Sequence, residues 1–144
     1  MSIIRTDEQA DAQEILKFII ETTDFYRAMG EILTDENIHH QLFEIANERE
    51  GYIEPFQKLV KELDEFPDSP DSDKELVDEL RGKITKLLSA DLKNAIFDKC
   101  LKKDELLAEA VNNTELSEQS TEFKRLLNSL YDHLANTKKR LSNN

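Results

Sequence analysis

The side chains of this chain best suited to chemistry are carboxylates and histidines at helical spacing. In a helical bundle, a glutamate followed three residues later by a histidine places both side chains on one helix face, where they can bind one metal centre. Glu48 begins such a pattern, but the third residue after it is Gly51, which has no side chain. His133 could complete one, but the third residue before it is Leu130. Asp104 is a further candidate because it interrupts an apolar stripe, so the candidate ligands come from three separate, incomplete patterns.

Each of these candidates also has an interpretation without a metal. Glu48 is expected to be a surface or boundary carboxylate, because an unpaired charge is costly to bury. His133 is expected to be a half-buried histidine with a hydrogen-bond partner. Asp104 faces the predicted core, and we favour either a salt bridge to Lys or Arg or an edge position open to water over a metal ion at that position. We therefore predict no metal site; if one exists, its ligands are Glu48, Asp104 and His133, and it holds iron or another divalent cation.

Other reactive side chains lack the neighbours that catalysis needs. His39 and His40 are adjacent, so on a helix they point in different directions and cannot chelate one ion. Cys100 lies beside an apolar stripe with no histidine close by in sequence, which favours a buried, inert thiol. The chain has only 3 glycines, which excludes a glycine-rich phosphate loop. We predict no catalytic residues, no cofactor and no enzymatic activity.

These side chains must be positioned by helices, because apolar residues recur in steps of three and four along nearly the whole chain. The periodicity predicts helices over about 7–33, 35–65, 73–112 and 118–141. We expect residues 1–144 to form one all-α domain, an antiparallel up-down four-helix bundle. Gly51 and Pro55 predict a kink in the second helix, and residues 89–91 predict a break or bend in the third segment.

Three apolar stripes define the expected core of the later segments. In the second helix the stripe comprises Ile38, Leu42, Ile45, Tyr52, Phe56, Leu59 and Leu63. In the second half of the third segment it comprises Ala95, Phe97, Leu101, Asp104, Ala108 and Val111. In the last helix it comprises Phe123, Leu127, Leu130, Leu134, Thr137 and Leu141.

The overall charge and composition exclude several classes of function. The net charge of −12 argues against binding to nucleic acid or to an anionic membrane surface, which both need clustered basic residues. No segment has the roughly 18 consecutive apolar residues of a membrane span, and residues 1–7 lack the features of a signal peptide. The single cysteine cannot form an internal disulfide, so we expect a cytoplasmic protein.

The chain resembles a bacterial family of ferritin-like four-helix proteins of unknown function, over a range from about Asp11 to Leu141. The segments that carry the resemblance are 15–29, 43–63, 96–111 and 123–141. Its most suggestive pieces are Asn47 to Glu50, the join from Lys83–Leu87 into Asp91–Lys93, and Phe97 to Cys100 followed by Asp104. The resemblance implies a ferritin-like bundle whose metal-binding relatives, such as the rubrerythrin-like proteins, carry a carboxylate and histidine ligand set.

On this resemblance, Glu48, Asp104 and His133 match ligand positions of the general plan. Gly51 and Leu130 depart from it, and Ile19 or Thr22 stands where a first-helix glutamate is expected. Because about half of the ligands are missing, the resemblance implies a degenerate site without oxidase chemistry.

Three functions follow as hypotheses. The first is a non-enzymatic ferritin-like bundle that acts through protein–protein contacts, expected as a homo-oligomer. The second is a metal-binding or redox protein with an incomplete carboxylate and histidine site, which metal analysis would distinguish from the first. The third is a carrier of an apolar ligand, held in a cavity opened by a kink at Gly51 and Pro55. The sequence does not identify a small-molecule ligand.

Overall fold

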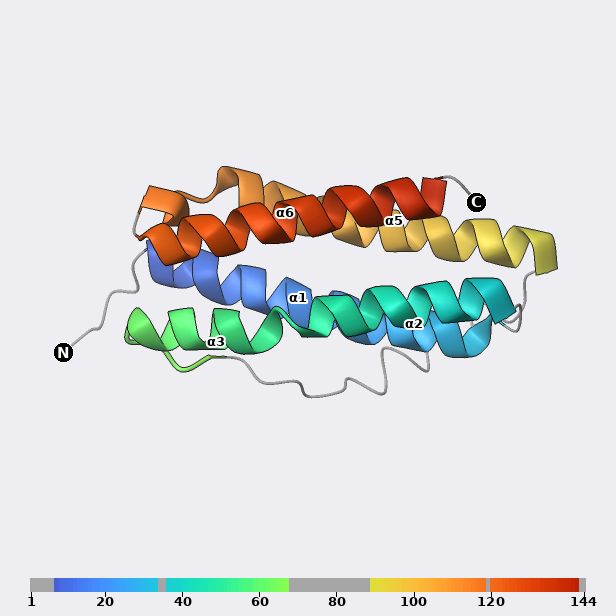
Figure 1. Ribbon diagram of the computed structural model, residues 1–144, viewed down its shortest axis with the longest axis horizontal. Coiled ribbons are helices and arrows are strands. Elements are labelled where there is room, and N and C mark those ends of the chain that lie inside the picture. The colour runs from blue at the N-terminus through green and yellow to red at the C-terminus, as the bar shows by residue number, and fades with distance from the viewer. Residues whose placement is uncertain (1–6, 34–35, 68–88, 119, 143–144) are drawn as a thin grey trace.

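The computed structural model describes residues 7–33, 36–67, 89–118 and 120–142. These residues form α1 (Asp7–Ile32), α2 (Glu36–Glu50), α3 (Ile53–Glu62), α5 (Ser89–Asn113), the 3₁₀-helix η1 (Leu116–Glu118) and α6 (Thr121–Ser142). The described residues contain no strand, which confirms the all-α prediction. In Figure 1, α2 and α3 lie end to end beside α1, and α5 and α6 complete the bundle.

The predicted helix bounds agree with the structure at the two ends of the chain. The prediction of 7–33 corresponds to α1, and the prediction of 118–141 corresponds to α6, which begins three residues later. Residues 73–88 of the third predicted segment lie outside the described residues, so the expected break near 89–91 stays a prediction; α5 spans Ser89–Asn113. No helix of the described residues combines the length and the apolar character needed to cross a membrane.

The second predicted helix is interrupted rather than continuous. α2 ends at Glu50 and α3 begins at Ile53, with a turn at Gly51 and Tyr52 between them. The amides of Gly51 and Tyr52 donate to carbonyls only three residues back, at 3.3 and 3.0 Å. Pro55 explains the position of the interruption, because it has no N–H to donate to the Gly51 carbonyl. Pro55 lies in the first turn of α3, where backbone N–H groups have no partner within the helix, so its missing N–H costs no hydrogen bond.

α3 ends in a residue with left-handed backbone conformation. Asp64 has a φ of 62°, and its amide donates to the Lys61 carbonyl at 3.0 Å. The amide of Glu65 donates to the Val60 carbonyl at 3.2 Å. These two bonds form a Schellman motif, in which glycine is the usual residue at the left-handed position.

Contacts between the helices fix their directions. α1 is antiparallel to α2 and α3, because Gln9 near the start of α1 donates to the Leu63 carbonyl after α3, whereas Arg27 late in α1 reaches Glu50 at the end of α2. α1 and α5 are also antiparallel, because Thr114 near the end of α5 donates to Asp11 near the start of α1.

α6 runs antiparallel to the rod formed by α2 and α3. Tyr52 contacts Ser129 in the first half of α6, and Glu48 pairs with Arg140 near its end. α5 therefore runs in the same direction as α2 and α3, and each helix lies beside antiparallel neighbours (Figure 1). This order differs from a simple up-down bundle, in which successive helices alternate in direction.

The core consists of two apolar clusters separated along the bundle by a polar layer. One cluster gathers residues 12–20 of α1, 53–60 of α3, 107–111 of α5 and 123–134 of α6, together with Leu116. The other gathers residues 25–33, 42–46 and 96–100, together with Leu141. Along α1, along α2 with α3, along α5 and along α6, the buried polar residues lie between the two apolar clusters. They are Thr22, Thr23, Arg49, Asp104 and Thr137.

The apolar stripes were predicted with unequal success. Every residue of the α6 stripe is buried, which confirms that prediction. The α5 stripe was partly wrong, because Ala95, Leu101 and Ala108 are only half-buried. Over the part of α5 whose burial is described, from residue 93 on, the buried residues are Ile96, Phe97, Cys100, Asp104, Leu107 and Val111. Asp104 therefore occupies a regular core position of α5 between Cys100 and Leu107.

Candidate functional site

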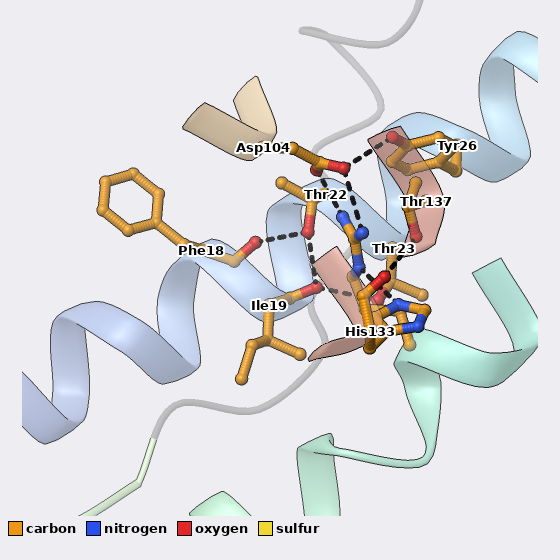
Figure 2. Close-up of polar contacts among 9 residues, drawn as sticks. Phe18, Ile19, Thr22, Thr23, Tyr26, Asp104, His133 and Thr137 are labelled. Atoms are coloured by element: carbon orange, nitrogen blue, oxygen red, sulfur yellow. Dashed lines mark hydrogen bonds and ion pairs between the residues drawn. The ribbon is translucent and has the colours of Figure 1, made fainter. Parts of the chain in front are cut away.

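The polar layer is centred on an ion pair between Arg49 of α2 and Asp104 of α5. The two guanidinium Nη atoms donate to the two carboxylate oxygens, at 2.5 and 3.0 Å. The Arg49 side chain has no exposed surface and that of Asp104 is 7% exposed. Tyr26 of α1 donates its hydroxyl to the same carboxylate at 2.7 Å, and Figure 2 shows the two side chains pointing toward each other. Asp104 thus receives hydrogen bonds from two different helices, and of the two interpretations without a metal the structure has the salt bridge rather than the edge position open to water.

Arg49 reaches the bundle centre because of its place on α2. It lies four residues after the buried Ile45 and three before Tyr52, so it continues the apolar stripe of its helix. Its position in the last turn also places a positive charge near the negative end of the helix dipole. The guanidinium carbon lies 4.9 Å from the centre of the Tyr26 ring, which adds a cation–π contact. Burial lowers the pKa of Arg49, but the Asp104 carboxylate raises it above its ordinary value.

His133 of α6 joins the same layer through Arg49. The Nε of Arg49 donates to Nε2 of His133 at 3.3 Å, so this ring nitrogen must be unprotonated. The centre of the His133 ring lies 5.5 Å from that of Tyr52. Burial, together with the nearby charge of Arg49, lowers the pKa of His133 to about 4. His133 is therefore a neutral acceptor at neutral pH, and its protonation would place a second cation against Arg49.

The threonines of the layer satisfy their own hydroxyl groups locally. Thr22 and Thr23 donate to the carbonyls of Phe18 and Ile19, each at 2.7 Å, and Thr137 donates to the carbonyl of His133 at 2.9 Å (Figure 2). Throughout the described part of the chain, every buried side-chain nitrogen and oxygen has a hydrogen-bond partner. The buried polar atoms of the layer therefore bond to one another or to the backbone, and none of them lacks a partner that a ligand could supply.

The thiol and the phenol beside the layer are held in their neutral forms. Cys100 is fully buried, and burial followed by the charge of Asp104 raises the pKa of its thiol. The pKa of Tyr26 is raised well above its ordinary value by the same two causes. Because the thiolate is the reactive form, Cys100 is an inert core residue, as its place beside the stripe suggested.

Glu48 lies outside the layer, on the surface of the bundle. It forms a bidentate pair with Arg140 of α6, with N–O distances of 2.8 and 3.0 Å. The hydrogen bonds from Arg140 lower the pKa of Glu48. This position confirms the interpretation of Glu48 as a surface carboxylate.

The three candidate ligands therefore do not converge on one metal position. Asp104 and His133 both contact Arg49, whereas Glu48 is turned outward to Arg140. Within the described residues, no three side chains of His, Cys, Asp and Glu are placed to hold a metal ion. A divalent cation between Asp104 and His133 would lie against the buried guanidinium, so these residues do not fit one.

The positions that depart from the ligand pattern also hold structural residues. Leu130 and Ile19 are fully buried in the apolar core, and Thr22 bonds its own helix. Gly51 is exposed at the turn between α2 and α3. None of these four positions offers a group that could complete a ligand set.

Two residues of the layer were not identified from the sequence. Arg49 was not assigned a role, although it fills the gap between Ile45 and Tyr52 in the predicted stripe of the second helix. Tyr26 is the other residue; its whole side chain is buried, and its hydroxyl donates to Asp104. A cation and an anion that each interrupt an apolar stripe, on Arg49 and Asp104, are the signal that could have predicted the pair.

Comparisons of the chain with protein-family models, with curated proteins and with solved structures give no match.

Proposed function

We propose that this protein is a non-enzymatic, ferritin-like helical bundle that acts through protein–protein contacts, including contacts with a second copy of itself. In this proposal the bundle centre contributes stability and register rather than chemistry. The lone buried thiol of Cys100 suits a reducing compartment, and we place the protein in the cytoplasm.

The directions of the helices support the ferritin-like part of the proposal. Ferritin-like bundles differ from simple up-down bundles in having one long connection that runs the length of the molecule. Here α2–α3 and α5 run in the same direction, and the part of the chain between them includes residues 68–88, outside the described residues.

The observation that carries the non-enzymatic part is the buried ion pair of Arg49 and Asp104. In a metal-binding bundle the carboxylates and histidines at the centre share a cation that comes from solution. Here the cation is part of the chain, and it already engages both Asp104 and His133. The layer has no orphaned buried group, and its thiol is held neutral, so it presents neither a ligand set nor a nucleophile.

Metal analysis tests this proposal directly. The purified protein is equilibrated in turn with Fe²⁺, Mn²⁺ and Zn²⁺, desalted, and analysed for bound metal. We expect well under one equivalent of each, unchanged in the double variant Asp104→Asn, His133→Ala. One equivalent that disappears in this variant would instead support the metal-binding alternative.

A further inference from the structure

The groove between α3 and α6 is the surface feature that the proposed function leaves unassigned. It has a volume of about 650 Å³ and includes apolar side chains of Pro55, Leu59 and Leu126. The turn at Gly51 contributes to it, because a residue without a side chain stands at one end. The apolar lining makes the groove suitable for contact with another apolar surface.

Charged residues border this lining in a balanced pattern. Glu54 and Lys58 border it on α3, and Glu122 and Arg125 border it on α6. All four are exposed, and none of them forms an ion pair with another described residue. Glu50, the remaining charged residue of the lining, is already paired with Arg27 at 2.6 Å. The groove is therefore close to neutral on a chain with a net charge of −12, so two copies that meet here bring little like charge together.

The positions of these four charged residues along the axis of the groove, called their levels below, follow from the contact between Tyr52 and Ser129. The Tyr52 hydroxyl lies 3.0 Å from the Ser129 carbonyl oxygen, which sets α3 and α6 in register. At about 1.5 Å per residue, Lys58 lies about 9 Å from this contact along α3, and Glu122 lies about 10 Å from it along the antiparallel α6. By the same rise, Glu54 and Arg125 lie about 3 and 6 Å from it. Each acid thus stands close to the level of a base on the opposite side of the groove.

We infer that this groove is the interface of a homodimer with its two-fold axis parallel to the groove. This symmetry keeps the level of every residue and exchanges the two sides, so α3 of each copy lies over α6 of the other. Lys58 then faces Glu122 of the second copy, and Glu54 faces Arg125 of the second copy. Every facing helix pair is antiparallel, as within the bundle, and the surface is complementary to itself, as a two-fold interface requires.

The inference rests on the protein-contact part of the proposed function and specifies its surface. Physiological ionic strength favours the association, because the Debye length of about 8 Å screens the overall repulsion more than it screens contacting pairs. The apolar floor supplies attraction, and the facing charges select the partner and the register.

Charge reversal with mixing of variants tests the inference. In the dimer, residue 58 of each copy faces residue 122 of the other copy, at two symmetric sites. Lys58→Glu therefore places an acid against an acid at both sites, and Glu122→Lys places a base against a base at both sites. We expect each variant alone to dissociate at least about tenfold more readily than the wild type, because two facing pairs become repulsive. An equimolar mixture of the two variants should associate again, because in the mixed dimer both positions regain opposite charges. An ion pair across the groove within one chain cannot produce this recovery.

The measurement is sedimentation equilibrium at high micromolar concentration, with helical content checked by circular dichroism. Lys124→Glu is the matched control, because Lys124 is an exposed base of α6 that does not line the groove. It should associate like the wild type. If Lys58→Glu does not fold, Arg125→Glu and Glu54→Arg provide the same test.

A wild-type protein that associates, with variants whose mixture stays monomeric, would overturn the groove interface and leave the proposed function in place. A wild type that is monomeric at these concentrations would overturn the interface together with the self-association part of the proposed function. The metal analysis tests the non-enzymatic part separately.

Discussion

Removing the positive charge from the polar layer is the most informative perturbation of this protein. Arg49→Met replaces the guanidinium with an apolar side chain and leaves Asp104 as a buried carboxylate whose remaining donor among these contacts is Tyr26. Breaking a buried ion pair by removing one partner costs about 3–5 kcal/mol. Asp104→Leu should cost a similar amount, because it leaves the fully buried guanidinium without an anion.

The double variant Arg49→Met, Asp104→Leu should be much more stable than the sum of the two losses suggests. Addition of the single losses gives about 6–10 kcal/mol, enough to unfold a typical domain of this size. With both charges gone, no buried ion remains, and the residual cost comes from the unpaired Tyr26 hydroxyl and His133 ring, about 1–3 kcal/mol. The coupling energy of the cycle should therefore be at least about 3 kcal/mol.

Urea unfolding followed by circular dichroism measures the four free energies of the cycle. Additive losses would refute the account, because they would mean that the two charges do not interact in the folded protein. A loss below about 1 kcal/mol for Arg49→Met would also refute it, since a surface pair behaves in that way.

Two further predictions concern the edge of the layer and the end of α3. The folded pKa of His133, about 4, lies below its ordinary value of 6.5, so this residue stabilises the fold above about pH 6.5 and loses that contribution as the pH falls toward 4. Relative to His133→Gln, which cannot titrate, the wild type should lose about 1–3 kcal/mol of unfolding free energy over this range, a value discounted for the partial exposure of the ring. Asp64→Gly should stabilise the protein by about 0.5–1 kcal/mol in thermal unfolding, because glycine adopts the observed φ of 62° without strain.

Each of these two predictions has a control. Carboxylates that titrate between pH 4 and 6.5 affect wild type and His133→Gln alike, so the difference between the two curves isolates His133; a flat difference contradicts the prediction. For Asp64, the control is Glu105→Gly in the exposed interior of α5, which should lose about 1 kcal/mol. If both glycine substitutions destabilise the protein, the left-handed position does not limit stability.

The helices were predictable from sequence because their apolar stripes follow one period. In α6 the stripe is uninterrupted by charge, and every predicted residue of it is buried. In α5 the small residues Ala95 and Ala108 fit two adjacent stripes equally well, and the stripe through Leu107 is the one that packs inward. Periodicity therefore predicts that a helix is amphipathic more reliably than it predicts which of two neighbouring faces is buried.

The polar layer was harder to predict because it depends on contacts between distant segments. Asp104 stood out as a charge within a stripe, and a salt bridge or an edge position open to water was expected for it, but the partner lies 55 residues earlier in the chain. Propensity alone favours a long cationic side chain on the surface, so Arg49 did not stand out. Pro55 cannot donate a hydrogen bond to the Gly51 carbonyl. Either a kink in one continuous helix or a turn between two helices accommodates this loss, and the sequence pattern is the same for both.

The cation at the bundle centre is Arg49 itself, and this assignment leaves no place for a metal ion between Asp104 and His133. Its most direct test is a crystal structure of protein equilibrated with Mn²⁺ or Fe²⁺, with anomalous diffraction recorded at the absorption edge of the metal. We expect the Arg49 guanidinium on both oxygens of Asp104, with no anomalous peak within bonding distance of Asp104 or His133. An anomalous peak bound by Asp104 and His133, with Arg49 turned away, would contradict this assignment.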